Sequence, residues 1–228
     1  MTGANRGLGL ETCRRLARLG HTVIVTSRDE AKGHTAVREL SQSGLTVTHH
    51  QLDVTKSQSI QRVRSVVEET FGRLDILVNN AGVFLDTTEA TDRATVLAMT
   101  SPLHTRKETL VATFETNTLG PFFMCQHFIP MMMKNNYGRV VNVTSQMGQL
   151  SSMGSGWTAY RISKTALNAV TRIFAQETAG KNILVNSVHP GWVQKIWGAR
   201  LRHCALRKGA KPLSGPPRSQ PVGLWASF

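Results

Sequence analysis

Cysteine is scarce in this chain of 228 residues, which contains three, Cys13, Cys125 and Cys204, at spacings that form no pair. This scarcity argues against a disulfide framework and against a zinc site built on cysteine pairs. The sequence also lacks a run of about 18 consecutive apolar residues, so it predicts no transmembrane helix. It does not open with a basic segment followed by an apolar one, so no signal peptide is expected. Together these absences favour a cytoplasmic protein.

Acidic residues are absent from the C-terminal stretch. All 14 carboxylates precede residue 178, whereas residues 194–228 contain seven lysines and arginines and no acid. The net charge of +13 therefore divides into +6 for the body, from 20 basic residues against 14 acids, and +7 for the tail. A modestly basic body fits a phosphate-bearing cofactor, and we expect neither nucleic acid nor a membrane as partner.

Apolar segments alternate with segments of helical periodicity along most of the chain. The expected strands cover residues 22–26, 45–50, 74–78, 139–145 and 182–188. This alternation predicts a single three-layer α/β domain, a doubly wound parallel sheet of the Rossmann type. Ligands of such sheets bind beyond the carboxyl ends of the strands, which is where the polar motifs of this sequence occur.

A glycine-rich segment, Thr2-Gly3-Ala4-Asn5-Arg6-Gly7-Leu8-Gly9, leads into the first predicted helix. Its glycines allow a tight turn and a close approach to a pyrophosphate, which the N-terminus of the helix stabilises. An apolar strand follows, as a βαβ unit requires. The strand that should feed this loop is largely missing, because only Met1 precedes it.

Two positions bear on which dinucleotide is bound. Arg28 follows the strand at 22–26, where an acid would bond the ribose 2′-hydroxyl and an arginine accommodates a 2′-phosphate. With Arg6 in the glycine loop, Arg28 favours NADP(H) over NAD(H); the alternative is a solvated loop cation beside Asp29. Asp53, at the end of the next strand, would accept a bond from an adenine amino group or cap the helix that starts near Thr55.

Tyr160 and Lys164 lie four residues apart in a predicted helix, so their side chains share one face. A phenol has an ordinary pKa of about 10, too high for proton exchange at neutral pH. A neighbouring ammonium would lower that pKa, as suits a general acid or base. Ser145 ends an apolar run and would hold a substrate oxygen near the phenol. The alternative is an exposed, solvated pair of side chains.

Asparagines mark two further segments. Asn79-Asn80-Ala81-Gly82 ends a predicted strand, where a buried carboxamide fixes neighbouring backbone or a cofactor edge. Asn117 lies in a long predicted helix over residues 108–133, interrupted around Gly120-Pro121; it is either satisfied locally or binds a water that relays protons from Lys164. Residues 83–110 are rich in threonine and predict a long loop with a short helix near 94–99.

Five motifs occur in a fixed order: T-G-x-x-x-G-x-G at 2–9, N-N-A-G at 79–82, N-T-L-G-P at 117–121, the Ser145/Tyr160/Lys164 set, and H-P-G-W-V at 189–193. In this order they resemble the short-chain dehydrogenase/reductase family, and its carbonyl-reductase-like members in particular. The resemblance implies an NADP(H)-dependent oxidoreductase that transfers hydride between nicotinamide and a carbonyl or alcohol substrate. It implies no metal, and homo-oligomers of the kind common in the family.

The resemblance also implies a role for each matching residue. Tyr160 protonates the carbonyl oxygen, Lys164 lowers the tyrosine pKa and bonds the nicotinamide ribose, Ser145 orients the carbonyl, and Asn117 holds the relay water. Asp53 would contact the adenine, and Arg6 and Arg28 the 2′-phosphate. The full set of expected cofactor contacts is Gly3, Asn5, Arg6, Gly7, Leu8, Gly9, Arg28, Asp53, Val54, Asn79, Ala81, Gly82, Tyr160, Lys164, Pro190, Gly191 and Val193.

Both ends of the chain depart from the family pattern. A truncated N-terminus, with Met1 standing for a valine codon used as a start, would explain the missing strand. After Val193 the family continues into a substrate lid and a last strand, which is doubtful here. We therefore divide the chain into an NADP-binding domain, residues 1–193, and an atypical basic tail, residues 194–228, expected to be irregular or disordered.

Two hypotheses explain the tail: a shift of reading frame, or a basic arm that binds an acidic partner. The departures at both ends leave two alternatives to an active enzyme. One is an inactive truncated homologue, and the other is a sensor that binds NADP(H) without turnover.

Overall fold

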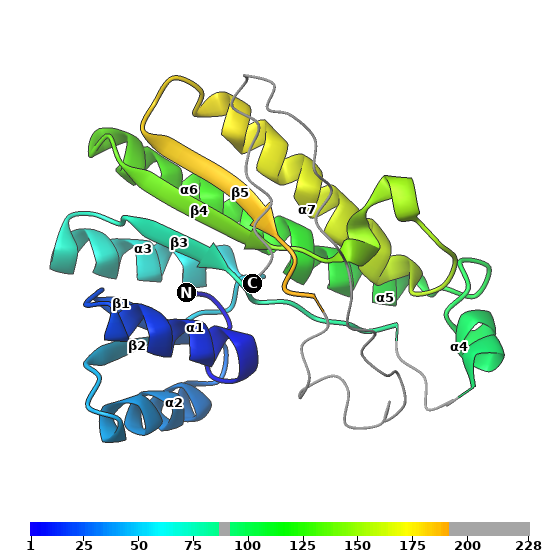
Figure 1. The fold of residues 1–228 in the computed structure, drawn as a ribbon, viewed down its shortest axis with the longest axis horizontal. Coiled ribbons are helices and arrows are strands. Elements are labelled where there is room, and N and C mark those ends of the chain that lie inside the picture. The colour runs from blue at the N-terminus through cyan, green and yellow to red at the C-terminus, as the bar shows by residue number, and fades with distance from the viewer. Residues whose placement is uncertain (87–91, 192–228) are drawn as a thin grey trace, which may run out of the picture.

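The computed structural model of this chain describes residues 1–86 and 92–191. Helices and parallel strands alternate along it, as the sequence predicts (Figure 1). The elements are α1 (Gly7–Arg18), β1 (Val23–Ser27), α2 (Glu30–Gln42), β2 (Val47–Gln51), α3 (Ser57–Phe71), β3 (Ile76–Asn79), α4 (Arg93–Met99), α5 (Lys107–Phe114), η1 (Glu115–Leu119), α6 (Gly120–Lys134), β4 (Gly138–Val143), η2 (Gln146–Gly148), η3 (Leu150–Ser152), α7 (Thr158–Glu177) and β5 (Ile183–Val188).

The sheet is divided into two parts. β1 pairs with β2, and β4 pairs with both β3 and β5, in each case in parallel. The first residues of the chain lie between these parts: the Met1 ammonium donates to Ile24 O at 2.9 Å, and Thr26 N donates to Met1 O at 3.1 Å. Thr2 N donates to Val78 O, at 3.0 Å, on the other side. The strand order is therefore that of a doubly wound Rossmann sheet, with a short remnant in the centre.

Among the described residues, only this remnant pairs with β1 and β3, in the position of the first strand of the sheet. The doubtful last strand, the residue Val193 and the tail of residues 194–228 lie outside the described residues.

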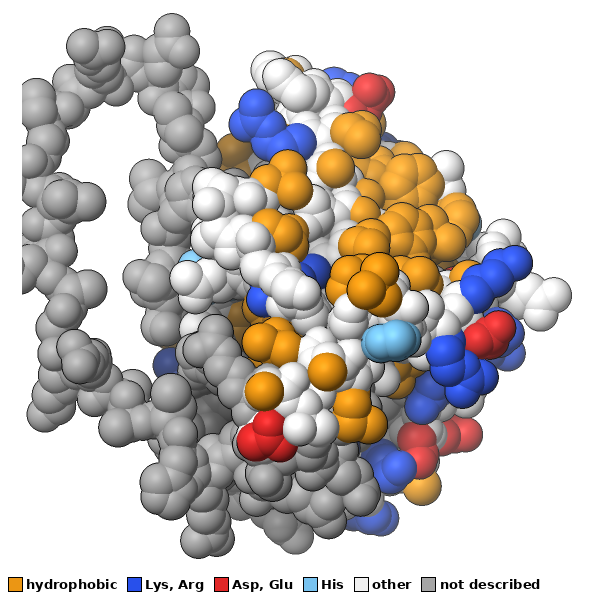
Figure 2. All heavy atoms as spheres, turned by 90° about the vertical axis from the view of Figure 1, so that its right-hand side faces the viewer, with side chains coloured by type: hydrophobic (Ala, Val, Ile, Leu, Met, Phe, Trp, Pro, Cys, Tyr) orange, Lys and Arg blue, Asp and Glu red, His pale blue; other side chains and the backbone are white. Residues whose placement is uncertain are grey.

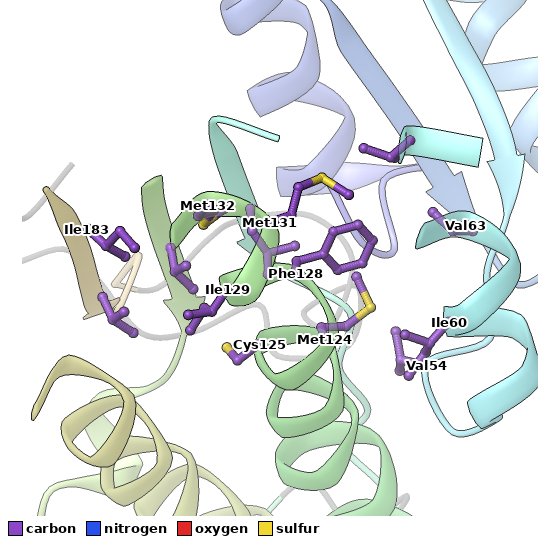
Figure 3. Packing of buried hydrophobic residues seen from close by; sticks show 14 of the residues in the cluster. Val54, Ile60, Val63, Met124, Cys125, Phe128, Ile129, Met131, Met132 and Ile183 are labelled. Atoms are coloured by element: carbon purple, nitrogen blue, oxygen red, sulfur yellow. The ribbon is translucent and has the colours of Figure 1, made fainter. Parts of the chain in front are cut away.

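Two apolar clusters fill the two sides of the sheet. The smaller one joins β1 and β2 to the buried faces of α1 and α2, and comprises Ala4, Cys13, Val23, Val25, Ala36, Leu40 and Val47. The larger one lies between the strands and the helices α3 and α6, and Figure 3 shows side chains of both helices meeting there. Its labelled members are Val54, Ile60, Val63, Met124, Cys125, Phe128, Ile129, Met131, Met132 and Ile183. The three-layer prediction is thus confirmed.

The long helix predicted over residues 108–133 differs in detail. It does not break at Gly120-Pro121; instead α5 passes through one π-helical segment, η1, and continues directly as α6. Pro121, which has no N–H to donate, is the second residue of α6 and directly follows the π-helical segment, so the change in hydrogen-bond pattern falls where the proline lacks a donor. Gly120 allows α6 to approach the loop before α3, since a Cβ there would lie 2.8 Å from Val54 Cγ2.

Candidate active site

The predicted catalytic side chains converge at the carboxyl end of β4. Ser145 follows β4 and caps η2, accepting a bond from Met147 N at 3.2 Å. Tyr160 lies in the first turn of α7, with the Ser145 side chain close enough to its phenol to lower the phenol pKa. The alternative of an exposed, solvated pair is wrong for Lys164, because this side chain is 4% exposed.

The Lys164 ammonium is enclosed beneath the Tyr160 ring. Its Nζ donates to Val143 O at 2.8 Å and lies 5.8 Å from the centroid of the Tyr160 ring. A Cβ on Gly82 would lie 3.7 Å from the same Nζ, which places the N-N-A-G segment against it. Burial disfavours the charged form, so it lowers the pKa of Lys164 to about 8.

The expected lowering of the Tyr160 pKa is wrong for the cofactor-free chain. Burial of the phenol raises its pKa above the ordinary value, and the nearby Ser145 side chain opposes that shift. Lys164 directs its ammonium to the Val143 carbonyl. A raised pKa keeps the phenol protonated at neutral pH, which is the form a proton donor requires.

Asn117 joins the segment after β3 to the helix that carries Tyr160. Its Oδ1 accepts from Val83 N at 2.8 Å, and its Nδ2 donates to Val83 O at 2.8 Å and to Ser163 Oγ at 3.0 Å. Ser163 Oγ in turn donates to Tyr160 O at 2.8 Å. The carboxamide is therefore satisfied by protein groups, but by two distant segments and not locally, and the relay water stays a prediction.

Asn79 requires a correction. Its side chain is 2% exposed and donates to Asn142 Oδ1 at 2.8 Å, in the core between β3 and β4, so it does not line a cofactor cleft. The neighbouring Asn80 faces the glycine loop: its Nδ2 donates to the carbonyls of Thr2 and Gly3 at 2.9 and 3.0 Å. Alternation along a strand explains the exchange, since successive side chains point to opposite faces.

The glycine loop is held against the N-N-A-G segment. Thr2 Oγ1 accepts from the amides of Asn80 and Ala81 at 3.0 and 2.9 Å. A Cβ on Gly3 would lie 2.8 Å from Ala81 Cα, and one on Gly9 would lie 2.7 Å from Asn80 Nδ2. Glycine is therefore needed for packing at both positions. The other predicted contacts, Asn5, Arg6, Gly7 and Leu8, lie at the turn into α1 and in its first residues.

A basic cavity of about 290 Å³ lies at the carboxyl ends of β1 and β2. Arg28 and Asp53 line it together with two cations that the sequence analysis missed, Lys56 and Arg62. Among the described residues, none of the three cations forms an ion pair. Their position in the α3 region gave no recognisable motif, so only the folded chain brings them beside Arg28.

Four further predicted cofactor contacts lie among the described residues: Asp53, Val54, Pro190 and Gly191. Asp53 Oδ1 accepts from Thr55 N at 3.0 Å and from Thr55 Oγ1 at 2.8 Å, in the turn before α3. The N-cap of α3 is Lys56, so Asp53 holds this turn and does not cap the helix. Val54 is buried against α6. Pro190 and Gly191 follow β5 at the same edge of the sheet as Ser145.

The lowered pKa of Lys164 predicts that the stability of the fold depends on pH. The unfolded chain, with a lysine pKa near 10.5, binds more protons at this group than the folded chain between about pH 8 and 10.5. Stability therefore rises with pH through this window. Relative to Lys164→Met, the unmodified chain should gain roughly 3 kcal/mol of unfolding free energy across it. Urea denaturation at closely spaced pH values measures this difference, and a constant difference would contradict it.

The described residues contain neither a membrane-spanning helix nor a candidate metal site. Within the described ranges, the helices include none that is long and apolar enough to cross a membrane. In the same part of the chain, histidine, cysteine and acidic side chains form no group of three or more suited to a metal ion.

Comparison with known proteins agrees with this geometry. The model of the short chain dehydrogenase family matches residues 1–202. Short-chain dehydrogenase/reductase 1 of Saponaria officinalis is 31% identical, over 99% of this chain and 92% of that protein. The NADPH carbonyl reductase 1 of Bos taurus is 30% identical, over 92% of this chain and 87% of that protein.

Among solved structures, a metagenomic short-chain oxidoreductase in complex with NADP superimposes with a TM-score of 0.70 and 30% identity. The superposition covers 84% of this chain and 80% of that one. With the family model matched over most of the sequence, these likenesses show that the chain belongs to the short-chain dehydrogenase/reductase family of oxidoreductases.

Proposed function

We propose that this chain is an NADP(H)-dependent oxidoreductase that interconverts a carbonyl compound and an alcohol. The observation that carries the proposal is the convergence of Ser145, Tyr160 and the buried Lys164 at the carboxyl end of β4, with the Ser145 side chain beside the Tyr160 phenol. The carbonyl reductase and the NADP complex among the similar proteins support the same reaction class.

Each side chain has a role in this reaction. The bound cofactor supplies or accepts the hydride. Tyr160 gives a proton to the carbonyl oxygen during reduction and takes it back during oxidation, and Ser145 orients that oxygen beside the phenol. Lys164 bonds the nicotinamide ribose, and Asn117 holds the water from which Lys164 is reprotonated.

The residues present fit a phosphorylated dinucleotide. Glycine at positions 3 and 9 keeps the loop closely packed against Asn80 and Ala81, and α1 begins immediately behind it. Arg28, Lys56 and Arg62 offer positive charge in one cavity without ion-pair partners among the described residues. We assign this cavity to the adenosine 2′-phosphate.

The assignment predicts a change of cofactor preference. Arg28→Gln should raise the KM for NADPH by about 10- to 100-fold, since a hydrogen bond to a charged group contributes about 1.5–3 kcal/mol. The KM for NADH should stay within about twofold, because NADH lacks the 2′-phosphate. Arg38→Gln, on the exposed side of α2, is the matched control. Equal changes for both cofactors would contradict the assignment.

Three broader predictions complete the proposal. Residues 1–193 form the cofactor-binding domain, and residues 194–228 form a separate basic tail. Exposed apolar side chains gather on the side of the molecule where α4, α5 and α7 lie (Figure 2). α5 and α7 each carry an exposed apolar side chain, Val111 and Ile162, which supports a homo-oligomer formed through these helices. A cytoplasmic location stays a prediction from the sequence.

The test of the proposed function is oxidation of NADPH, followed by its absorbance, with a panel of aldehydes and ketones. We expect turnover of at least one carbonyl substrate, and a lower rate when NADH replaces NADPH. Binding of NADPH, measured by calorimetry, without turnover of any substrate would favour the sensor. Absence of binding would favour the inactive homologue.

A further inference from the structure

The start of α7 lacks a cap of its own. The residue before it, Trp157, has φ +49° and provides no side-chain hydrogen bond to the helix. By contrast, α2 and α4 are each capped by the aspartate that precedes them, Asp29 and Asp92, through the amide three residues later. The first amides of a helix need an acceptor, so α7 must be capped from elsewhere.

Asp86, from the segment after β3, supplies that acceptor. Its Oδ2 accepts from Ala159 N at 2.6 Å and from Tyr160 N at 3.3 Å, across 73 residues of sequence in the first case. Asp86 is 9% exposed, and its buried Oδ1 has no hydrogen-bond partner. A buried carboxylate is unfavourable unless compensated. Here the positive end of the α7 dipole lies directly against it.

The same segment also holds the Tyr160 ring. Phe84 packs edge-to-face against that ring, with the centroids 4.6 Å apart and the planes at 78°. Asp86, two residues after Phe84, accepts a hydrogen bond from the backbone amide of Tyr160. One residue before Phe84, Val83 is tied through Asn117 to Ser163, one turn along α7. Tyr160 is thus held at its amide, its ring and its carbonyl.

We propose that Asp86 is a positioning residue for the reaction: by capping α7 from the β3 segment, it fixes the first turn of the helix and with it the Tyr160 phenol against Ser145. The inference rests on the proposed function for its kinetic consequence. It goes beyond the catalytic set, because Asp86 belongs to none of the motifs recognised in the sequence.

The test uses two nearly isosteric variants. Asp86→Asn keeps an acceptor oxygen, whereas Asp86→Leu removes both oxygens without leaving a cavity. We expect Asp86→Leu to lower kcat by about 10- to 100-fold, because small displacements of a catalytic group have effects of this size. The Kd for NADPH should stay within about twofold, since this carboxylate contacts α7 and not the cofactor cavity. Asp86→Asn should restore most of kcat. Asp92→Ala, which removes the cap of α4, is the control and should leave kcat unchanged.

A second readout does not depend on turnover. The chain has two tyrosines, so ring-labelled [13C]tyrosine gives one resonance for Tyr160 and one for Tyr137. Asp86→Leu should shift or broaden the Tyr160 resonance, Asp86→Asn should restore it, and Tyr137 should not change. An unchanged Tyr160 resonance would overturn the positioning role, whatever the activity. A shifted resonance in a chain without turnover would refute the proposed function alone.

Loss of kcat, NADPH binding and thermal stability together in Asp86→Leu would mean a general structural role and would also overturn the proposal. Asp86→Ala repeats the test if the leucine variant does not fold. Failure of both to fold would assign Asp86 to global stability.

Discussion

Replacement of Tyr160 by phenylalanine is expected to abolish turnover while NADPH still binds. The change removes one oxygen, the proposed proton donor beside Ser145. The ring packing against Phe84, at a centroid distance of 4.6 Å, is kept. General acid–base catalysis contributes about 10²–10⁴-fold, so kcat should fall at least by this factor. Steady-state kinetics measures kcat, and calorimetry should give an NADPH Kd within about twofold of the unmodified chain.

The other tyrosine provides the matched control. Tyr137 lies next to β4 beneath Arg139, whose guanidinium carbon is 4.3 Å from the ring centroid, away from Ser145. Tyr137→Phe should therefore keep the full rate. Residual activity of Tyr160→Phe within about tenfold of the unmodified chain would refute Tyr160 as the acid.

A strand added ahead of Met1 is expected to stabilise the fold strongly. β1 and β3 belong to separate sheets, and the remnant joins them at its first residues alone. The Met1 ammonium is buried there, and burial lowers its pKa. An extension of five apolar residues, such as Val-Ala-Leu-Val-Val, would continue the parallel ladder and turn this ammonium into an amide. Strands at the centre of a parallel sheet are apolar on both faces, which is why no polar residue is included.

Two opposing contributions set the size of the stabilisation that the added strand should give. Burial of an apolar side chain stabilises by about 1.5–3 kcal/mol, and ordering of each backbone unit costs about 1–2 kcal/mol. Five residues with the added hydrogen bonds leave a net gain of about 3 kcal/mol, or roughly 10 °C in Tm for a domain of this size. Thermal unfolding followed by circular dichroism measures the shift. A Gly/Ser extension of equal length is the control, and an equal shift in both would contradict strand insertion.

The two predictions address different parts of the molecule. Tyr160 tests whether the chemistry is located correctly. The extension tests whether the gap between β1 and β3 limits stability. If the extended chain is both more stable and more active, the gap, and not the catalytic set, limits the activity of this chain.

The sequence by itself determined the class of fold and predicted the candidate catalytic residues. Alternating apolar and amphipathic segments predict a parallel sheet, because a short apolar run is typical of a buried strand and an amphipathic segment is typical of a helix. The observed strands lie within a few residues of the predicted ones. Tyr160 and Lys164 were recognisable because helical spacing puts positions four apart on one face. These inferences depend on local geometry, which neighbouring residues dictate.

What only the tertiary structure decided depends on contacts between distant segments. The pleat of β3 and its neighbours decides whether Asn79 or Asn80 faces the glycine loop. The gathering of Lys56 and Arg62 beside Arg28 follows from how α3 packs. The direction of the Tyr160 pKa depends on burial, and the cap of α7 comes from Asp86, 73 residues before Ala159. Burial and long-range hydrogen bonds arise only when the chain is folded, and no local pattern records them.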